Sequence, residues 1–208
     1  MSGARRRWGA GRTLLWMGGA FAAGCIPTGR LLTKALTGDS LDDIGDGKPG
    51  SSNVARSLGW KPGATVLGLD AGKAFVPAIA ARLAGADEGV VAAVGLSAMV
   101  GHITVVKGRG AACALGAAFA MDPPMMAIGC VPLVGGSLLH HHAEAVTITA
   151  VSRPLISLAL HPRRPARALA PLALIGILFG ARLKGSAGAG LPSSPRVFLK
   201  RFWLDRDE

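Results

Sequence analysis

The residues of this chain that are best suited to chemistry lie in a polar segment, residues 37–62, between two apolar stretches. The segment reads TGDSLDDIGDGKPGSSNVARSLGWKP and combines glycines with cationic, hydroxyl and amide side chains. Glycine lets the backbone approach a ligand closely, and the polar side chains donate hydrogen bonds to anionic oxygens. This composition suits a phosphate group, although ordinary turn chemistry in a flexible loop would use many of the same residues. The candidate residues are Gly45, Gly47, Lys48, Gly50, Ser52, Asn53 and Arg56.

A second short loop, formed by Lys107, Gly108, Arg109 and Gly110, again alternates cations with glycines. Taken alone, it would be a basic turn that fixes membrane topology. Taken with the first loop, it indicates a phosphorylated substrate held at a membrane surface. His102 stands shortly before it in an apolar stretch. There a histidine is either a hydrogen-bonded packing residue or a group that moves a proton or touches phosphate.

The elements that must position these loops are long stretches almost free of charge, in a chain that is 50% hydrophobic. About 20 apolar residues cross a bilayer as a helix. Residues 111–121 are too few to cross alone and are predicted to form a half-helix. The sequence therefore predicts an all-α, polytopic membrane helix bundle of about six or seven transmembrane helices. It would form one membrane domain, residues 1–208, with a basic tail at 184–208. The predicted spans are residues 13–36, 63–84, 88–106, 124–140, 143–160 and 167–183.

The formal net charge is +11. On a soluble domain such a charge would suggest nucleic-acid binding. Here lysine and arginine flank the apolar segments, which favours topology control and affinity for anionic lipid or phosphate, with no nucleic-acid partner. Residues 196–203 in the tail are basic and amphipathic, and this pattern predicts a segment lying on the membrane surface.

The sequence gives little evidence for a metal site or a disulfide bond. The three cysteines, Cys25, Cys113 and Cys130, all lie in apolar stretches without metal-type spacing. Residues 140–142 are three consecutive histidines, followed by Glu144, but adjacent side chains on a helix point in different directions. We therefore predict no metal site and no cofactor.

One predicted span carries an ion pair. Asp70 and Lys73 are three residues apart, so on a helix they share one face. Charges inside a membrane are costly and are functional or structural by default. A structural pairing that orients the helix is the favoured interpretation.

Taken in order, these motifs resemble those of the bacterial acyl-phosphate glycerol-3-phosphate acyltransferases. The family's GSIPxG is similar to GCIPTG at 24–29, and its GSGNxGATNxxR to GDGKPGSSNVAR at 45–56. Its LDxxKG resembles LDAGKA at 69–74, while GHI at 101–103 and GRG at 108–110 resemble the two ends of its third motif. The resemblance covers about residues 15–140.

The chain also departs from the family pattern. Asp46 stands for a serine, Lys48 for an asparagine and Arg109 for a lysine. The third motif is shorter by about five residues. The family's last motif, with a histidine and an asparagine, has no counterpart, because Asn53 is the chain's only asparagine.

The resemblance implies a multi-pass protein of the bacterial plasma membrane with about seven helices and both loops facing the cytoplasm. It implies acyl transfer from acyl phosphate to the first hydroxyl of glycerol 3-phosphate in phospholipid synthesis. By the same resemblance, Arg56, His102 and Asn53 form the catalytic set. The alternatives are a non-catalytic membrane protein of the same fold, which would bind anionic lipid or a partner enzyme, and a small transporter. The implied substrate- and phosphate-binding residues are Gly45, Gly47, Lys48, Gly50, Ser52, Lys107, Gly108, Arg109 and Gly110.

Overall fold

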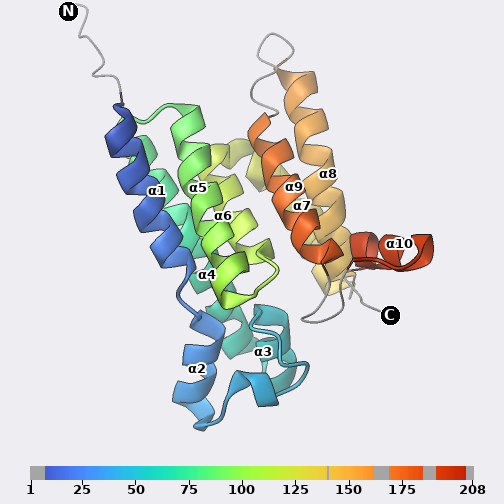
Figure 1. Cartoon of the computed structure of the whole chain (residues 1–208). Helices are drawn as coiled ribbons and strands as arrows, with labels where there is room; N and C mark the ends of the chain where they lie inside the picture. Colours follow the sequence, from blue (N-terminus) through green and yellow to red (C-terminus); the bar gives the residue numbers. More distant parts are fainter. Residues whose placement is uncertain (1–7, 140, 162–168, 185–190, 205–208) are drawn as a thin grey trace, which may run out of the picture. The chain divides into compact units, whose positions relative to one another are not determined.

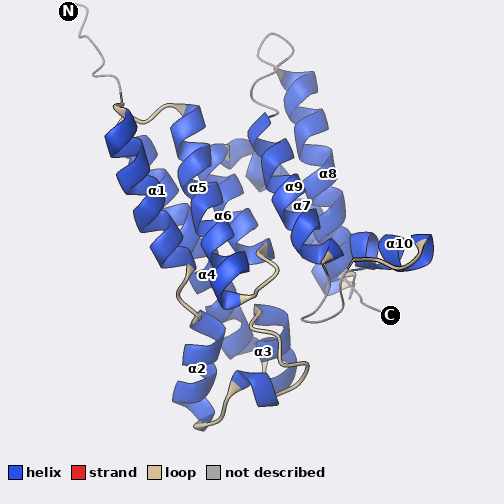
Figure 2. Cartoon of the chain, viewed as in Figure 1, coloured by secondary structure: helices blue, strands red, loops and turns tan. Residues whose placement is uncertain are grey.

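The chain folds into helices joined by short loops (Figures 1 and 2). The computed structural model describes residues 8–139, 141–161, 169–184 and 191–204, and within these ranges it has no strand. The predicted all-α class is confirmed. The helices are α1 Ala10–Gly24, α2 Thr28–Thr37, η1 Leu41–Asp43, α3 Ser51–Leu58, α4 Trp60–Leu83, α5 Glu88–Gly101, η2 His102–Val106, α6 Ala111–Met121, α7 Pro123–Leu138, α8 His142–Leu160, α9 Leu169–Leu183 and α10 Pro195–Leu204.

The helices group into two compact units. Residues 1–108 and 112–121 form the first, and residues 109–111 and 122–208 form the second. Each unit is described by itself. The prediction of a single membrane domain stays a prediction, because compact packing within a unit does not define a domain of the membrane fold.

In the described part of the chain, three helical segments are long and apolar enough to cross a membrane: residues 60–83, 88–106 and 143–160. All three match predicted spans, at 63–84, 88–106 and 143–160. Shorter apolar helices cover residues 111–121, 123–136 and 169–183. At 11 residues, α6 is too short to cross alone, in line with the predicted half-helix.

The predicted span at 13–36 is wrong as a single helix. Helix α1 ends at Gly24 and α2 begins at Thr28, with Pro27 between them. Proline lacks the N–H that would continue the helix, and its ring disfavours the helical conformation in the residue before it. Helix α2 then ends at Thr37 and is capped by Gly38, whose φ of 81° is the left-handed conformation typical of a glycine cap.

In the first unit α1 packs closely along α5. A Cβ added at Gly24 would lie 2.0 Å from the Ala98 carbonyl oxygen, and one at Gly101 would lie 2.4 Å from that of Phe21. Only glycine permits such an approach of two helix backbones, which is the usual packing of helices in lipid. Helix α5 begins after Asp87, whose Oδ1 accepts from the Val90 N–H at 2.9 Å.

Candidate active site

The loop between α2 and α3 is folded around one buried side chain, Asn53 of α3, which is 2% exposed. Its Nδ2 donates to the Ile44 carbonyl at 2.9 Å and to the Lys48 carbonyl at 3.1 Å. Its Oδ1 accepts from the Asp46 N–H at 3.1 Å and from the Ser57 hydroxyl at 3.4 Å. The amide thus satisfies the loop backbone on both sides, so Asn53 fixes the shape of the loop.

Glycine is required where the loop closes on this amide. Gly45 has φ +64°, and a Cβ there would lie 2.1 Å from the Asn53 Oδ1. Gly47 has φ +67°, and its added Cβ would lie 2.9 Å from the Asp42 carbonyl oxygen. Both conformations are costly for other residues. These two glycines therefore let the loop double back over Asn53.

The rim of the loop carries a cluster of three charges. The Arg56 guanidinium lies 2.8 Å from the Asp46 Oδ2, and the Lys48 Nζ lies 3.7 Å from the same oxygen. The side chains are 62%, 38% and 40% exposed for Arg56, Asp46 and Lys48, so all three are open to a ligand. Asp46 and Lys48 are the departures from the family's loop motif that change charge, and the structure pairs them with each other. The cluster of Arg56, Lys48 and Asp46 therefore has a net charge of +1.

The start of α3 adds neutral donors to this rim. Gly50 precedes the helix, and a Cβ added there would meet no atom within 4 Å. Ser52 lies exposed in the first turn. The first N–H groups of a helix have no acceptor within the helix and favour an anion. The predicted binding residues from Gly45 to Arg56 therefore come together in one region.

A turn of π-helix, η2, runs from His102 to Val106 and leads into the second loop. Lys107 ends it in the left-handed conformation with φ +65°, and its side chain is exposed. A Cβ on Gly108 would lie 2.1 Å from the His102 Nε2, so His102 packs directly beneath this glycine. The histidine is 3% exposed, and its backbone carbonyl accepts from the Gly108 N–H at 3.4 Å. Arg109 and Gly110 group with the second unit, so their place in this site stays a prediction.

An arginine that the sequence analysis did not select joins the two loops. Arg30 of α2 donates from NH1 to the Val106 carbonyl at 2.9 Å, next to Lys107. Its NH2 lies 3.0 Å from the Asp42 Oδ1 in the first loop. The signal available in the sequence was an arginine inside an apolar stretch, directly after the Pro27 break.

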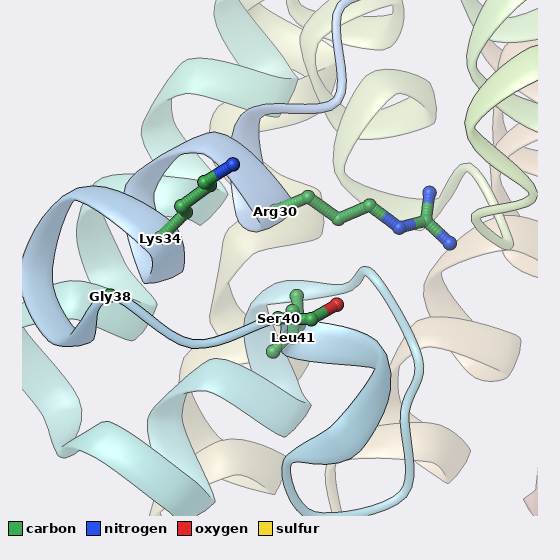
Figure 3. Close-up of a pocket in the computed structure, with 5 residues that line it drawn as sticks. All are labelled: Arg30, Lys34, Gly38, Ser40 and Leu41. Atoms are coloured by element: carbon green, nitrogen blue, oxygen red, sulfur yellow. The ribbon is translucent and has the colours of Figure 1, made fainter.

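Beside Arg30 lies an open depression of about 380 Å³. Figure 3 shows Arg30 and Lys34 extending from the same helix near Ser40 and Leu41. Lys34 adds a second cation from α2 close to the first loop. The sequence analysis places both residues within the predicted span at 13–36 and includes neither among the site residues.

A buried polar cluster lies beneath these loops. The Lys73 Nζ donates to the Asp70 Oδ1 at 2.5 Å, to the Ile26 carbonyl at 2.5 Å and to the Thr28 hydroxyl at 3.0 Å. The Thr28 hydroxyl in turn donates to the Asp70 Oδ1 at 2.5 Å. The predicted pairing of Asp70 with Lys73 is confirmed. It holds the break between α1 and α2 against α4.

The same cluster reaches the candidate histidine. The His102 Nδ1 lies 3.7 Å from the Asp70 Oδ1, and it has no hydrogen-bond partner among the residues that the structure describes. The buried side of His102 therefore faces the Asp70 carboxylate, and the other side faces Gly108. This arrangement suits a residue that positions the second loop.

Among the described residues, no group of three or more histidine, cysteine, aspartate or glutamate side chains could hold a metal. His141 lies 3.2 Å from Glu144, which is a pair and not a metal-binding set. His140 lies outside the described residues.

Comparison with known proteins adds independent information. Residues 14–186 match the family model described as glycerol-3-phosphate acyltransferase. A protein of that name from Roseobacter denitrificans is 31% identical over 195 residues, covering 90% of this chain and 95% of the relative. Another, from Geobacter sulfurreducens, is 37% identical over 154 residues, covering 70% and 77%.

Two solved structures share the fold. One is the glycerol 3-phosphate form of PlsY (YgiH), an integral membrane glycerol 3-phosphate acyltransferase. It is 26% identical to this chain with a TM-score of 0.72, over 82% of this chain and 88% of that protein. The lysophosphatidic acid form of PlsY is 25% identical, with a TM-score of 0.70 and coverage of 82% and 87%. The predicted membrane helix bundle is thereby confirmed.

Proposed function

Because the chain belongs to the glycerol-3-phosphate acyltransferase family, we propose that its two loops bind acyl phosphate and glycerol 3-phosphate and catalyse acyl transfer between them. The glycerol hydroxyl oxygen attacks the acyl carbon, and the bond from that carbon to the phosphate oxygen breaks. Inorganic phosphate leaves with the electron pair and takes up the hydroxyl proton. The products are lysophosphatidic acid and phosphate, so the balance requires no metal, cofactor or covalent enzyme intermediate.

The observation that carries this proposal is the exposed Arg56 on a loop whose backbone Asn53 holds in place. A guanidinium presents a planar fork of donors that fits phosphate oxygens. Its present partner, Asp46, is a surface carboxylate, and such pairs are weak enough to exchange. A substrate phosphate can therefore replace Asp46 on Arg56, with Lys48 beside it.

The remaining residues of the two loops neutralise phosphate charge or hold the loop backbones in place. Lys107, with its exposed ammonium, neutralises a second phosphate, and Gly108 lets the chain pass closely over His102. Asn53 and His102 are buried, and we assign them to orienting the two loops from within. Arg109 and Gly110 complete the second loop in this proposal. Acceleration by such a site comes from positioning and from preorganised charge.

The proposed location is the bacterial plasma membrane with both loops facing the cytoplasm. The link from Arg30 to both Asp42 and Val106 supports a common side for the loops. Glycerol 3-phosphate is charged and does not cross the apolar core of a bilayer unaided. A site that uses it must open to the compartment that holds it.

A direct assay tests the proposal. Purified protein in detergent receives palmitoyl phosphate and labelled glycerol 3-phosphate, and lysophosphatidic acid and free phosphate should appear in equal amounts. The rate should not change when a chelator is added, and palmitoyl coenzyme A should give no product. Failure of the folded protein to form product with acyl phosphates of several chain lengths would refute the proposal.

A further inference from the structure

Helix α10 (Pro195–Leu204) has no role in the proposed reaction, yet it is firmly held within the second unit. The Arg201 guanidinium donates to the Leu183 carbonyl, the last residue of α9, at 2.8 Å. The Arg182 guanidinium donates to the Phe202 carbonyl at 3.1 Å and to the Thr147 hydroxyl at 2.7 Å. The Phe202 ring stacks on Phe179 with centroids 4.2 Å apart. The helix is therefore a fixed part of its unit.

These contacts also place α10 at one end of the unit. Leu183 ends α9, and Thr147 lies in the second turn of α8, so α10 lies where α9 ends and α8 begins. Figure 1 shows it running across the ends of these two helices and not along them. Since residues 143–160 are long and apolar enough to cross a membrane, their end marks a membrane surface. A helix lying across that end runs along the surface.

The outer face of α10 has the chemistry of such a surface. Pro195, Leu199 and Trp203 are spaced by four residues and form one stripe. Leu199 is 54% exposed and Trp203 is 43% exposed. Arg196 and Lys200 flank this stripe, and neither side chain has a hydrogen-bond or ion-pair partner among the described residues. An apolar stripe bordered by cations is complementary to the acyl boundary and the anionic headgroups of a bilayer.

We propose that the outer face of α10 is a binding surface for anionic lipid. Pro195, Leu199 and Trp203 enter the acyl boundary, and Arg196 and Lys200 bind lipid phosphates. No residue of this surface belongs to the proposed acyltransferase site, and the proposal does not depend on that activity. Burial of the apolar stripe fixes the depth of α10 in the bilayer, and the two cations select anionic over zwitterionic headgroups.

A variant with a single tryptophan tests both parts of the proposal, the insertion of the apolar stripe into the bilayer and the preference for anionic lipid. Trp8, Trp16 and Trp60 are replaced by Phe, which leaves Trp203 as the only tryptophan. The protein is reconstituted in equimolar mixtures of phosphatidylglycerol and phosphatidylcholine in which one or the other lipid is brominated on its acyl chain. Brominated phosphatidylglycerol should quench Trp203 at least about twofold more strongly than brominated phosphatidylcholine.

The charge variant R196Q/K200Q should remove this preference, so that the two brominated lipids quench Trp203 equally while quenching itself persists. The matched control R12Q/K61Q changes two exposed cations elsewhere and should keep the preference. No quenching by either lipid, or equal quenching in the starting protein, would overturn the proposal. So would quenching that disappears as the protein-to-lipid ratio rises, because a second copy of the chain would then cover the stripe.

Discussion

Two regions of the first unit each pair an aspartate with a nearby lysine, and they do so under opposite conditions. In the loop, the side chains of Asp46 and Lys48 are 38% and 40% exposed, and their closest charged atoms are 3.7 Å apart. In the membrane span, those of Asp70 and Lys73 are 2% and 5% exposed and 2.5 Å apart. An exposed pair is screened by water and can exchange partners, whereas a buried pair cannot lose one partner without leaving an unpaired charge. The first pair is therefore suited to binding and the second to architecture.

The buried pair gives the largest expected effect. Asp70→Ala should destabilise the protein by about 3–5 kcal/mol, because it leaves the Lys73 ammonium without a carboxylate in an apolar region. The double variant Asp70→Ala with Lys73→Ala should be the more stable of the two. Thermal unfolding in detergent measures the difference. Asp46→Ala is the matched control, with a loss of at most about 1 kcal/mol. Equal losses for Asp70→Ala and Asp46→Ala would remove the distinction between the two regions.

Arg56 gives the next effect, on activity and not on stability. Arg56→Ala should lower kcat/KM by about two to three powers of ten, the usual loss for one well-placed charge-stabilising donor. Arg56→Lys should recover only part of the rate, because a point charge lacks the planar fork. Steady-state rates of lysophosphatidic acid formation report both. Arg12→Ala, an exposed arginine outside the loop, should leave the rate unchanged. A similar fall in kcat/KM for Arg12→Ala would contradict a specific role of Arg56 in binding the substrate phosphate.

Gly45→Ala tests whether the loop backbone is preorganised. A Cβ at this position would collide with the Asn53 Oδ1, and the φ of +64° is itself strained for alanine. We expect kcat/KM to fall by about tenfold, the equivalent of about 1.4 kcal/mol of strain. Gly68→Ala in α4 is the control, because its added Cβ meets nothing within 4 Å. If Gly45→Ala kept full activity, the loop would have to reshape freely around Asn53.

The smallest effect is expected for the exposed carboxylate itself. Asp46→Asn removes the charge that competes with substrate for Arg56, so KM for glycerol 3-phosphate should fall by about threefold. The unfolding temperature should hardly change. Asp46→Ser with Lys48→Asn restores the family's residues and should keep activity, because the net charge of the cluster is the same. A rise in KM for Asp46→Asn would show that Asp46 helps to bind the substrate.

Local sequence patterns predicted much of the fold. Residues 88–106 were predicted as a span and form α5 with η2, because Asp87 caps the start and Lys107 ends the run in a left-handed conformation. The span at 63–84 matches α4 because the segment is mostly apolar, and its two central charges, Asp70 and Lys73, pair with each other. Glycines and cations in two loops were likewise visible as a set. These features depend on neighbours along the chain, and a sequence displays them directly.

Contacts between distant residues were not visible in the sequence. Arg30 reaches Val106, 76 positions away, and Lys73 reaches the Ile26 carbonyl, 47 positions away. The helix break at Pro27 could be suspected from the residue type. The side chains that hydrogen-bond the residues around the break come from α4. The burial of Asn53 beneath the loop likewise depends on how α3 folds back.

The sequence by itself therefore determined most of the apolar helices, which loops carry glycines and cations, and which buried charges must be paired. Only the tertiary structure decided which carboxylate pairs with each cation and how exposed that pair is. It gave Arg56 an exposed carboxylate, which a phosphate replaces in the proposed reaction, and it gave Lys73 a buried one. Burial decides the difference, because water weakens an exposed pair and its absence makes an unpaired charge costly. Exposure is a property of the packed fold and not of residue types or their spacing.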